Sequence, residues 1–131
     1  MIGVDTNILV RYIAGDDAKQ SRLAAEFIGT LTFENPGFVS LVCIAELYWV
    51  LDHTFKASRD EIVTIIQMLL TSEEILIENT ALVHAALNLY NTTNADFDDC
   101  IIALRSRSAG CDFTVTFDRK AAKALGMTLL Y

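Results

Sequence analysis

Short apolar runs alternate with helical hydrophobic patterns along the whole chain. The apolar runs predict strands at residues 1–4, 38–39, 75–77, 113–117 and 127–130. The periodic segments predict helices at residues 6–13, 17–31, 40–53, 58–70, 80–91, 95–109 and 118–125. Strands that are almost continuously apolar are typical of a parallel sheet covered by helices on both faces. The sequence therefore predicts an α/β fold.

Length and composition limit the kind of protein further. The 131 residues contain 53% hydrophobic and 21% charged residues, which excludes a disordered chain. Because no repeat or linker interrupts the sequence, we predict a single domain over residues 1–131. The N-terminus has no signal-peptide pattern, and the longest apolar stretch, residues 38–51, is too short to cross a membrane. Three cysteines without a C-x-x-C pair favour a reducing environment, so we expect a cytoplasmic protein.

The net charge of −7 by itself disfavours a nucleic-acid partner, because the phosphate backbone is also negative. This argument weakens if several acids converge on divalent cations, which would cancel part of the charge. The positions of the acids therefore matter more than their number.

Two acids directly follow predicted strands. Asp5 comes after the strand at residues 1–4, and Asp118 comes after the strand at residues 113–117. Ligands of open parallel α/β sheets bind beyond the carboxyl ends of the strands, so both acids are candidates for a functional site. Each acid could instead simply cap the helix that follows it.

Glu46 lies within a helix that is apolar on nearly every face. A carboxylate in such surroundings has to be paired, hydrogen-bonded, metal-bound or protonated, because an isolated buried charge costs several kcal/mol. The alternative is a partly exposed Glu46, or one that pairs with a base such as Arg11.

Three further acids open the helix at residues 95–109. Asp96 and Asp99 are three residues apart and therefore share a helix face. Asp98 is rotated from Asp99 by about 100°, so we expect that both cannot point at one centre. We interpret Asp98 as a first-turn acid that favours the helix dipole, and Asp96 could serve as the N-cap.

Carboxylates from dispersed segments, without histidine or cysteine among them, favour Mg²⁺ or Mn²⁺ over zinc. One or two such ions could polarise a phosphodiester, as in two-metal nucleases. The positive charge of the bound ions would also attract nucleic acid, which the negative net charge of the chain repels.

The ordered set of motifs resembles the PIN-domain ribonucleases, in particular the VapC-type toxins of prokaryotic toxin–antitoxin pairs. The resemblance rests on residues 4–9 (VDTNIL), Glu46 after Ser40, residues 95–103 (ADFDDCIIA) and residues 116–118 (TFD). It implies a catalytic, metal-binding quartet of Asp5, Glu46, Asp99 and Asp118. It also implies auxiliary roles for Asp96, Thr6, Asn7 and Thr116.

The same resemblance implies a three-layer α/β/α sandwich with a central, mainly parallel five-stranded sheet. It further implies Mg²⁺- or Mn²⁺-dependent hydrolysis of RNA to 5′-phosphate and 3′-hydroxyl ends, homodimerisation, and neutralisation by a VapB-type antitoxin. Basic residues near the predicted site could contact RNA phosphates or simply be solvated: Arg11, Arg119, Lys120 and Lys123. The sequence shows no evident aromatic stacking platform.

Two other functions are compatible with the pattern. Asp5 after a first strand also occurs in phosphoaspartate-type phosphatases and receiver domains, although a phosphatase of that kind would carry a second Asp where this chain has Asn7. Alternatively, the acids belong to a non-catalytic, cation-dependent binding module.

Overall fold

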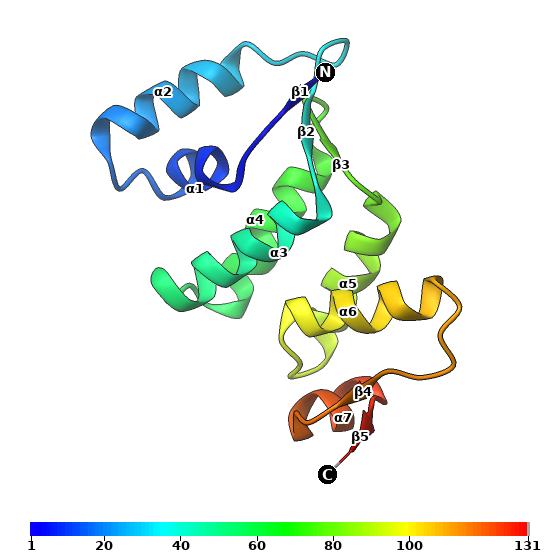
Figure 1. Cartoon of the computed structure of the whole chain (residues 1–131). Helices are drawn as coiled ribbons and strands as arrows, with labels where there is room; N and C mark the ends of the chain where they lie inside the picture. Colours follow the sequence, from blue (N-terminus) through cyan, green and yellow to red (C-terminus); the bar gives the residue numbers. More distant parts are fainter. Residues whose placement is uncertain (131) are drawn as a thin grey trace. The chain divides into compact units, whose positions relative to one another are not determined.

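The computed structural model describes residues 1–130, which form two compact units (Figure 1). The first unit comprises Met1–Thr80, and the second begins at Ala81. The single domain expected over residues 1–131 stays a prediction, and residue 131 lies outside the described chain. Within residues 1–130, no helix is long and apolar enough to span a membrane.

The elements follow the predicted alternation of strands and helices. The first unit contains β1 (Ile2–Gly3), α1 (Thr6–Ala14), α2 (Ala18–Gly29), β2 (Gly37–Val39), α3 (Leu41–Trp49), η1 (Val50–Thr54), α4 (Arg59–Thr71) and β3 (Ile75–Ile77). The helix α5 (Thr80–Thr92) starts at the boundary and leads into the second unit. That unit continues with α6 (Phe97–Ser108), β4 (Val115–Thr116), α7 (Arg119–Leu125) and β5 (Thr128–Leu129).

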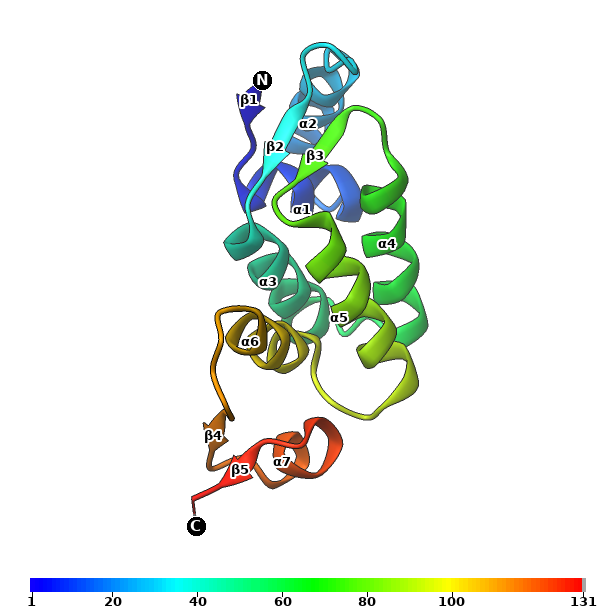
Figure 2. The ribbon, with the colours of Figure 1, turned by 90° about the vertical axis from the view of Figure 1, so that its right-hand side faces the viewer.

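All strand pairs are parallel, which confirms the predicted α/β class. In the first unit the strand order is β1-β2-β3, with Ile2 opposite Gly37 and Gly37 opposite Ile75 (Figure 2). In the second unit β4 pairs with β5, and Val115 lies opposite Thr128. Within residues 1–130, three strands are hydrogen-bonded in the first unit and two in the second, which is consistent with the α/β sandwich that the resemblance implies. Three of the strands are only two residues long, so each offers few backbone groups for further pairing.

Gly37 allows the first sheet to pack closely. A Cβ atom at this position would lie 2.8 Å from Cδ1 of Leu31 and 2.9 Å from Cγ2 of Val4. Both side chains are buried, so a larger residue would force the core apart. The glycine therefore helps to set the position of β1, from which the chain enters Asp5 and α1.

The helix boundaries are set by recognisable caps. Ser58 and Glu61 form the predicted capping box at the start of α4, in which each side chain accepts a hydrogen bond from the other residue's backbone N–H. Gly15 and Gly126 end α1 and α7 with φ angles of 62° and 70°, a conformation that favours glycine. The predicted helix over residues 40–53 differs in its second half, because residues 50–54 form the π-helix η1.

Each unit has buried apolar residues that fix the helices bearing the candidate acids. In the first unit α1 packs against both α2 and α3, and Leu9, Ile44 and Leu47 are fully buried. In the second unit α6 packs against α7, and Ala103 of α6 contacts a small buried cluster with Ala121 and Met127. This packing positions the N-terminal ends of α6 and α7, where several acids lie.

Candidate functional site

The second unit contains a cluster of three carboxylates at the start of α6. One ligand oxygen from each of Asp96, Asp98 and Asp99 lies within 4.8 Å of the others. All three side chains are partly buried. The shared position of Asp96 and Asp99 agrees with their three-residue spacing on the helix.

The proximity of Asp98 corrects the expectation that it cannot share a centre with Asp99. The Asp98 side chain folds back so that its Oδ1 accepts a hydrogen bond from the Asp99 backbone N–H at 2.9 Å. The rotation between adjacent helix positions fixes the direction of the Cβ atoms, but a short side chain at the first turn can still bend toward its neighbour. Asp98 therefore belongs to the cluster, and the acid-rich run of residues 96–99 was the only sequence signal for it.

The cluster changes the titration of Asp99. Partial burial raises the pKa of the Asp99 carboxyl above its ordinary value, and the charges of Asp98, Asp96 and Asp118 raise it further. The ammonium group of Lys120 opposes this shift in the Asp99 pKa. The electrostatic influence of Asp118 on Asp99 means that α7 contributes a fourth carboxylate to this region.

Asp118 itself is held by local hydrogen bonds. Its Oδ1 caps α7 by accepting from the Ala121 N–H at 2.9 Å, as the capping alternative predicts. Its own backbone N–H donates to Oγ1 of Thr116 at 3.0 Å. Thr116 thus fixes the backbone at the point where β4 ends and Asp118 begins.

Asp96 occupies the N-cap position of α6, but its side chain forms no capping hydrogen bond. Its Oδ1 instead accepts from Nζ of Lys120 at 2.9 Å. This ion pair joins the start of α6 to the first turn of α7. Both side chains are about two-fifths exposed, so solvent screens the pair substantially.

The first unit holds the other two acids of the predicted quartet, and Thr6 connects them. The Thr6 backbone N–H donates to Oδ1 of Asp5 at 2.8 Å, and its hydroxyl Oγ1 donates to Oε1 of Glu46 at 3.1 Å. Thr6 is buried, with 6% of its surface exposed. A single buried residue therefore orients carboxylates that are 41 positions apart in the sequence.

Glu46 is exposed, on the one face of this nearly all-apolar helix that it shares with other exposed side chains. Three side chains, those of Val42, Glu46 and Trp49, line an exposed face of α3, while Ile44 and Leu47 face the core. The alternative of a partly exposed Glu46 is therefore confirmed. The hydrogen-bond partner of Glu46 is Thr6 and not Arg11.

The basic residues suggested as phosphate contacts differ in their surroundings. Arg11 binds both carboxylate oxygens of Asp16 at 2.8 and 2.9 Å and donates to Gln20, so its guanidinium is engaged within the first unit. Lys120 pairs with Asp96, as described above. Arg119 and Lys123 are exposed on α7, and Asn7 is exposed in the first turn of α1.

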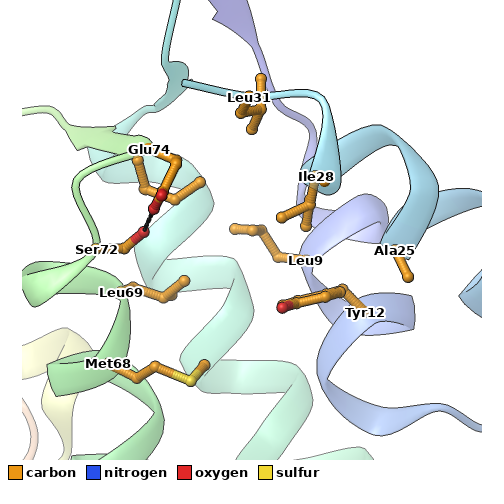
Figure 3. Close-up of a pocket in the computed structure, with 11 residues that line it drawn as sticks. Leu9, Tyr12, Ala25, Ile28, Leu31, Met68, Leu69, Ser72 and Glu74 are labelled. Carbon is orange, nitrogen blue, oxygen red and sulfur yellow. Dashed lines mark hydrogen bonds between the residues drawn. The ribbon is translucent and has the colours of Figure 1, made fainter. Parts of the chain in front are cut away.

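A cavity of about 330 Å³ also lies in the first unit (Figure 3). Apolar side chains from α1, α2 and α4 line it, including Leu9, Ile28 and Leu69. Its polar edge carries Ser72, whose hydroxyl donates to Glu74 Oε2 at 2.9 Å. None of the predicted quartet lines this cavity, so it is not part of the acidic site.

The structure also contains an aromatic stack that sequence analysis missed. The rings of Trp49 and His53 lie with their centroids 4.5 Å apart and an interplanar angle of 13°. The spacing of four residues within one predicted helix was the available signal.

Only oxygen ligands are offered by the acids described above. Asp96, Asp98 and Asp99 of the second unit form a group with spacing suitable for one cation, and Asp118 lies near them. Asp5 and Glu46 each have one oxygen engaged with Thr6 and a second oxygen on the same carboxylate. This donor chemistry fits a hard divalent cation such as Mg²⁺ or Mn²⁺ better than zinc.

Comparison with known proteins identifies the family of this chain. A VapC ribonuclease from Aquifex aeolicus (strain VF5) is 25% identical to this chain over 120 residues, which cover 92% of this chain and 89% of that protein. The PIN domain family model matches residues 2–125, and this range includes all four acids of the predicted quartet. The chain therefore belongs to the PIN-domain family.

Proposed function

We propose that the protein is an endoribonuclease of the VapC type that hydrolyses RNA phosphodiesters with the help of Mg²⁺ or Mn²⁺. The observation that carries this proposal is the crowding of Asp96, Asp98 and Asp99 within 4.8 Å, beside Asp118, in a chain of the PIN-domain family. The VapC ribonuclease relative supports RNA as the substrate class.

The crowded carboxylates supply a physical reason for a bound cation. Partial burial raises the pKa of Asp99, and repulsion between the like charges at this spacing raises it further. A bound Mg²⁺ or Mn²⁺ would neutralise this repulsion and supply the positive charge that polarises a phosphodiester. Asp99 and Asp118, with Asp96 beside them, would hold it in the second unit. Asp5 and Glu46 of the first unit stay predicted ligands of the quartet that the resemblance implies.

In the proposed reaction, a water oxygen forms a bond to phosphorus, and the bond from phosphorus to the 3′ oxygen breaks. The 3′ oxygen takes up a proton, so the products carry 5′-phosphate and 3′-hydroxyl ends. Thr6 orients the carboxylates of Asp5 and Glu46 through its backbone and its hydroxyl. Asp98 uses one oxygen for the Asp99 N–H, and the resemblance implies Asp99 and not Asp98 as a ligand, so Asp98 is the weaker candidate.

The proposed function also includes a protein partner, an oligomeric state and a cellular compartment. We infer that the protein acts as the toxin of a toxin–antitoxin pair, is neutralised by a small VapB-type antitoxin, functions as a homodimer and works in the cytoplasm. Growth arrest on expression, relieved by co-expression of a neighbouring small gene, is the expected result for such a pair.

The direct test is cleavage of a defined, end-labelled single-stranded RNA with Mg²⁺, with Mn²⁺ and with EDTA. We expect cleavage with either ion and none with EDTA. Asp5→Asn and Asp99→Asn keep the shape of the side chain but remove its charge, and both are expected to abolish most of the activity. Asp112→Asn, a change of the same kind at an exposed acid of the second unit, serves as the matched control.

Four outcomes would contradict the proposal. Cleavage that persists in EDTA, or that Asp99→Asn leaves at the parent rate, would remove the metal-dependent acidic site as its basis. Measurable Mg²⁺ binding without cleavage of any tested RNA would favour a cation-dependent binding module, and an acyl phosphate on Asp5 would favour phosphoaspartate chemistry.

A further inference from the structure

An exposed aromatic stack lies at the end of α3, on the first unit. Trp49 is 51% exposed, and the His53 ring covers it at a centroid distance of 4.5 Å and an angle of 13°. Trp49 is the only tryptophan in the sequence. A flat ring with this much exposed surface is available to stack with another ring.

The stack is held in place by the backbone around it. His53 Nδ1 lies 3.1 Å from the Trp49 carbonyl oxygen and 3.4 Å from Oδ2 of Asp52. With two oxygens facing Nδ1, this nitrogen carries the proton and donates. The histidine belongs to the π-helix η1, a rare helical form that occurs frequently at functional sites. The imidazole orientation is thus fixed before any ligand binds.

The stack is close to a candidate metal ligand. Glu46 and Trp49 are both exposed and are three residues apart on α3, so they are neighbours on one helix face. Glu46 is in turn fixed by the Thr6 hydroxyl. A group bound on Trp49 would lie about one helical turn from the Glu46 carboxylate.

We propose that Trp49 and His53 form a nucleobase platform, which binds an unpaired base of single-stranded RNA next to Glu46. The inference rests on the proposed ribonuclease function and specifies how that site would hold its substrate. Stacking of unpaired bases on aromatic side chains is a general way to bind single-stranded RNA. Because the chain carries a net charge of −7, base stacking supplies an attraction for RNA that the overall charge does not.

The surroundings favour a base over an apolar protein partner. Glu46 separates the exposed Trp49 from Val42, and the charged Asp52 lies beside His53, so the apolar surface is interrupted. Apolar docking surfaces are contiguous and larger. Lys56 is exposed just after η1 and adds a positive charge suitable for an RNA phosphate.

The single tryptophan makes the platform directly observable. We would titrate the whole protein in EDTA, where cleavage is off, with a 12-nucleotide oligoadenylate and with an abasic ribose-phosphate 12-mer. We expect the oligoadenylate to quench Trp49 emission and the abasic strand to leave it nearly unchanged. His53→Ala keeps the fluorophore and is expected to weaken oligoadenylate binding several-fold.

Cleavage kinetics provide an independent measurement. Trp49→Ala is expected to raise the KM for single-stranded RNA about tenfold, with kcat within about twofold of the parent, because a stacking contact that does not touch the reacting atoms stabilises ground state and transition state alike. Trp49→Phe keeps an aromatic face and should restore most of the affinity. Phe33→Ala removes a 73% exposed ring elsewhere in the first unit and should leave the KM unchanged.

The outcomes separate this inference from the proposed function. If a labelled oligoadenylate binds by fluorescence anisotropy while Trp49 emission stays constant, or if Trp49→Ala cleaves with the parent KM, the platform is refuted and the ribonuclease remains. If Trp49→Ala alters the mass in sedimentation but leaves RNA affinity unchanged, the face is an interface between copies, which also refutes it. Absence of both RNA binding and cleavage would overturn the platform together with the ribonuclease.

Discussion

The two units hold their candidate acids in opposite ways. In the first unit, Asp5 and Glu46 each accept a hydrogen bond from Thr6, so the protein itself supplies donors for them. In the second unit, Asp99 has acids around it, and both burial and their charges raise its pKa. Asp5 and Glu46 are therefore stabilised by a donor residue that the fold supplies, whereas the charged form of Asp99 is disfavoured by its surroundings.

This difference has a consequence for cation binding. Hydrogen bonds from the protein fix the orientation of a carboxylate, so such a carboxylate has its ligand orientation even without a cation. Carboxylates that repel one another gain stability when a cation binds, because ligand binding to the folded state raises its stability. We therefore expect the second unit to respond to Mg²⁺ more strongly than the first.

The largest expected effect separates Asp99 from its neighbour. Asp99→Asn should lower kcat/KM for RNA cleavage by about 10²–10³-fold, because loss of a metal ligand is worth several kcal/mol of transition-state stabilisation. Asp98→Asn should lower it by less than about tenfold, since the Asp98 side chain already serves the Asp99 N–H. Initial rates at saturating Mg²⁺ provide the comparison, with circular dichroism to show that both variants fold.

Equal losses in the two variants would break this distinction. They would mean that the three carboxylates at the start of α6 act as one ligand set, and that the hydrogen bond which Asp98 accepts from the Asp99 N–H does not limit its role.

A smaller effect is expected at Thr6, which positions acids in the first unit. Thr6→Val keeps the shape and the backbone N–H but removes the hydroxyl that donates to Glu46. Loss of an orienting hydrogen bond to a ligand typically costs about 10–100-fold in metal affinity or activity, so we expect a decrease in that range. Thr6→Ser keeps the hydroxyl and should retain most of the parent activity.

The serine variant is the decisive control for Thr6, together with the Mg²⁺ concentration at half-maximal rate. If Thr6→Val and Thr6→Ser lose activity equally, the methyl group and its packing matter, and the hydroxyl does not orient Glu46.

Much of the fold was predictable because local patterns determine it. The capping signal at Ser58 and Glu61 was confirmed, the strand at residues 75–77 was located to the residue, and every helix predicted over ten or more residues is present. Caps and hydrophobic periodicity act over a few residues, so a sequence carries them directly. Three strands were predicted in place but too long, as for residues 113–117, where only Val115 and Thr116 pair, and the strand predicted at residues 38–39 begins one residue earlier.

The features that were missed depend on side-chain direction or on tertiary context. The bend of Asp98 toward Asp99 reflects one local hydrogen bond, which helical geometry alone does not predict. The exposure of Glu46 depends on which face of α3 meets the core, and a nearly all-apolar helix does not reveal this face. The π-helix η1, and with it the fixed ring of His53, has no sequence signature of comparable strength.

A few-fold effect is expected when Lys120 is changed. Lys120→Met removes the ion pair with Asp96 and leaves the acidic cluster with more net negative charge. Exposed ion pairs contribute about 0.2–1 kcal/mol, so the Mg²⁺ concentration at half-maximal rate should fall by about two- to threefold. Lys123→Met, on the same helix and exposed, is the matched control.

The salt dependence sharpens the Lys120 comparison. The difference from the parent should shrink as ionic strength rises, because added salt screens exposed charges. An increase in the Mg²⁺ requirement, or a higher KM for RNA at unchanged Mg²⁺ requirement, would instead assign Lys120 to the RNA phosphates.

The smallest expected effect concerns the stability of the metal-free protein. Since the folded state raises the Asp99 pKa, folding favours the protonated form, and ionisation of Asp99 destabilises the protein as pH rises through and above the ordinary carboxyl pKa. At pH 7 in EDTA, Asp99→Asn should raise the thermal midpoint by a few degrees at most, because solvent screens the charges at this partly exposed site. Below the ordinary carboxyl pKa the difference in stability should vanish, because Asp99 is then protonated in both the folded and the unfolded state.

With Mg²⁺ at pH 7 the order of the two stabilities should reverse, since the parent gains binding energy that the variant lacks. A variant that is less stable than the parent in EDTA would show that hydrogen bonds stabilise Asp99 and its neighbouring acids, as the hydrogen bonds from Thr6 stabilise Asp5 and Glu46.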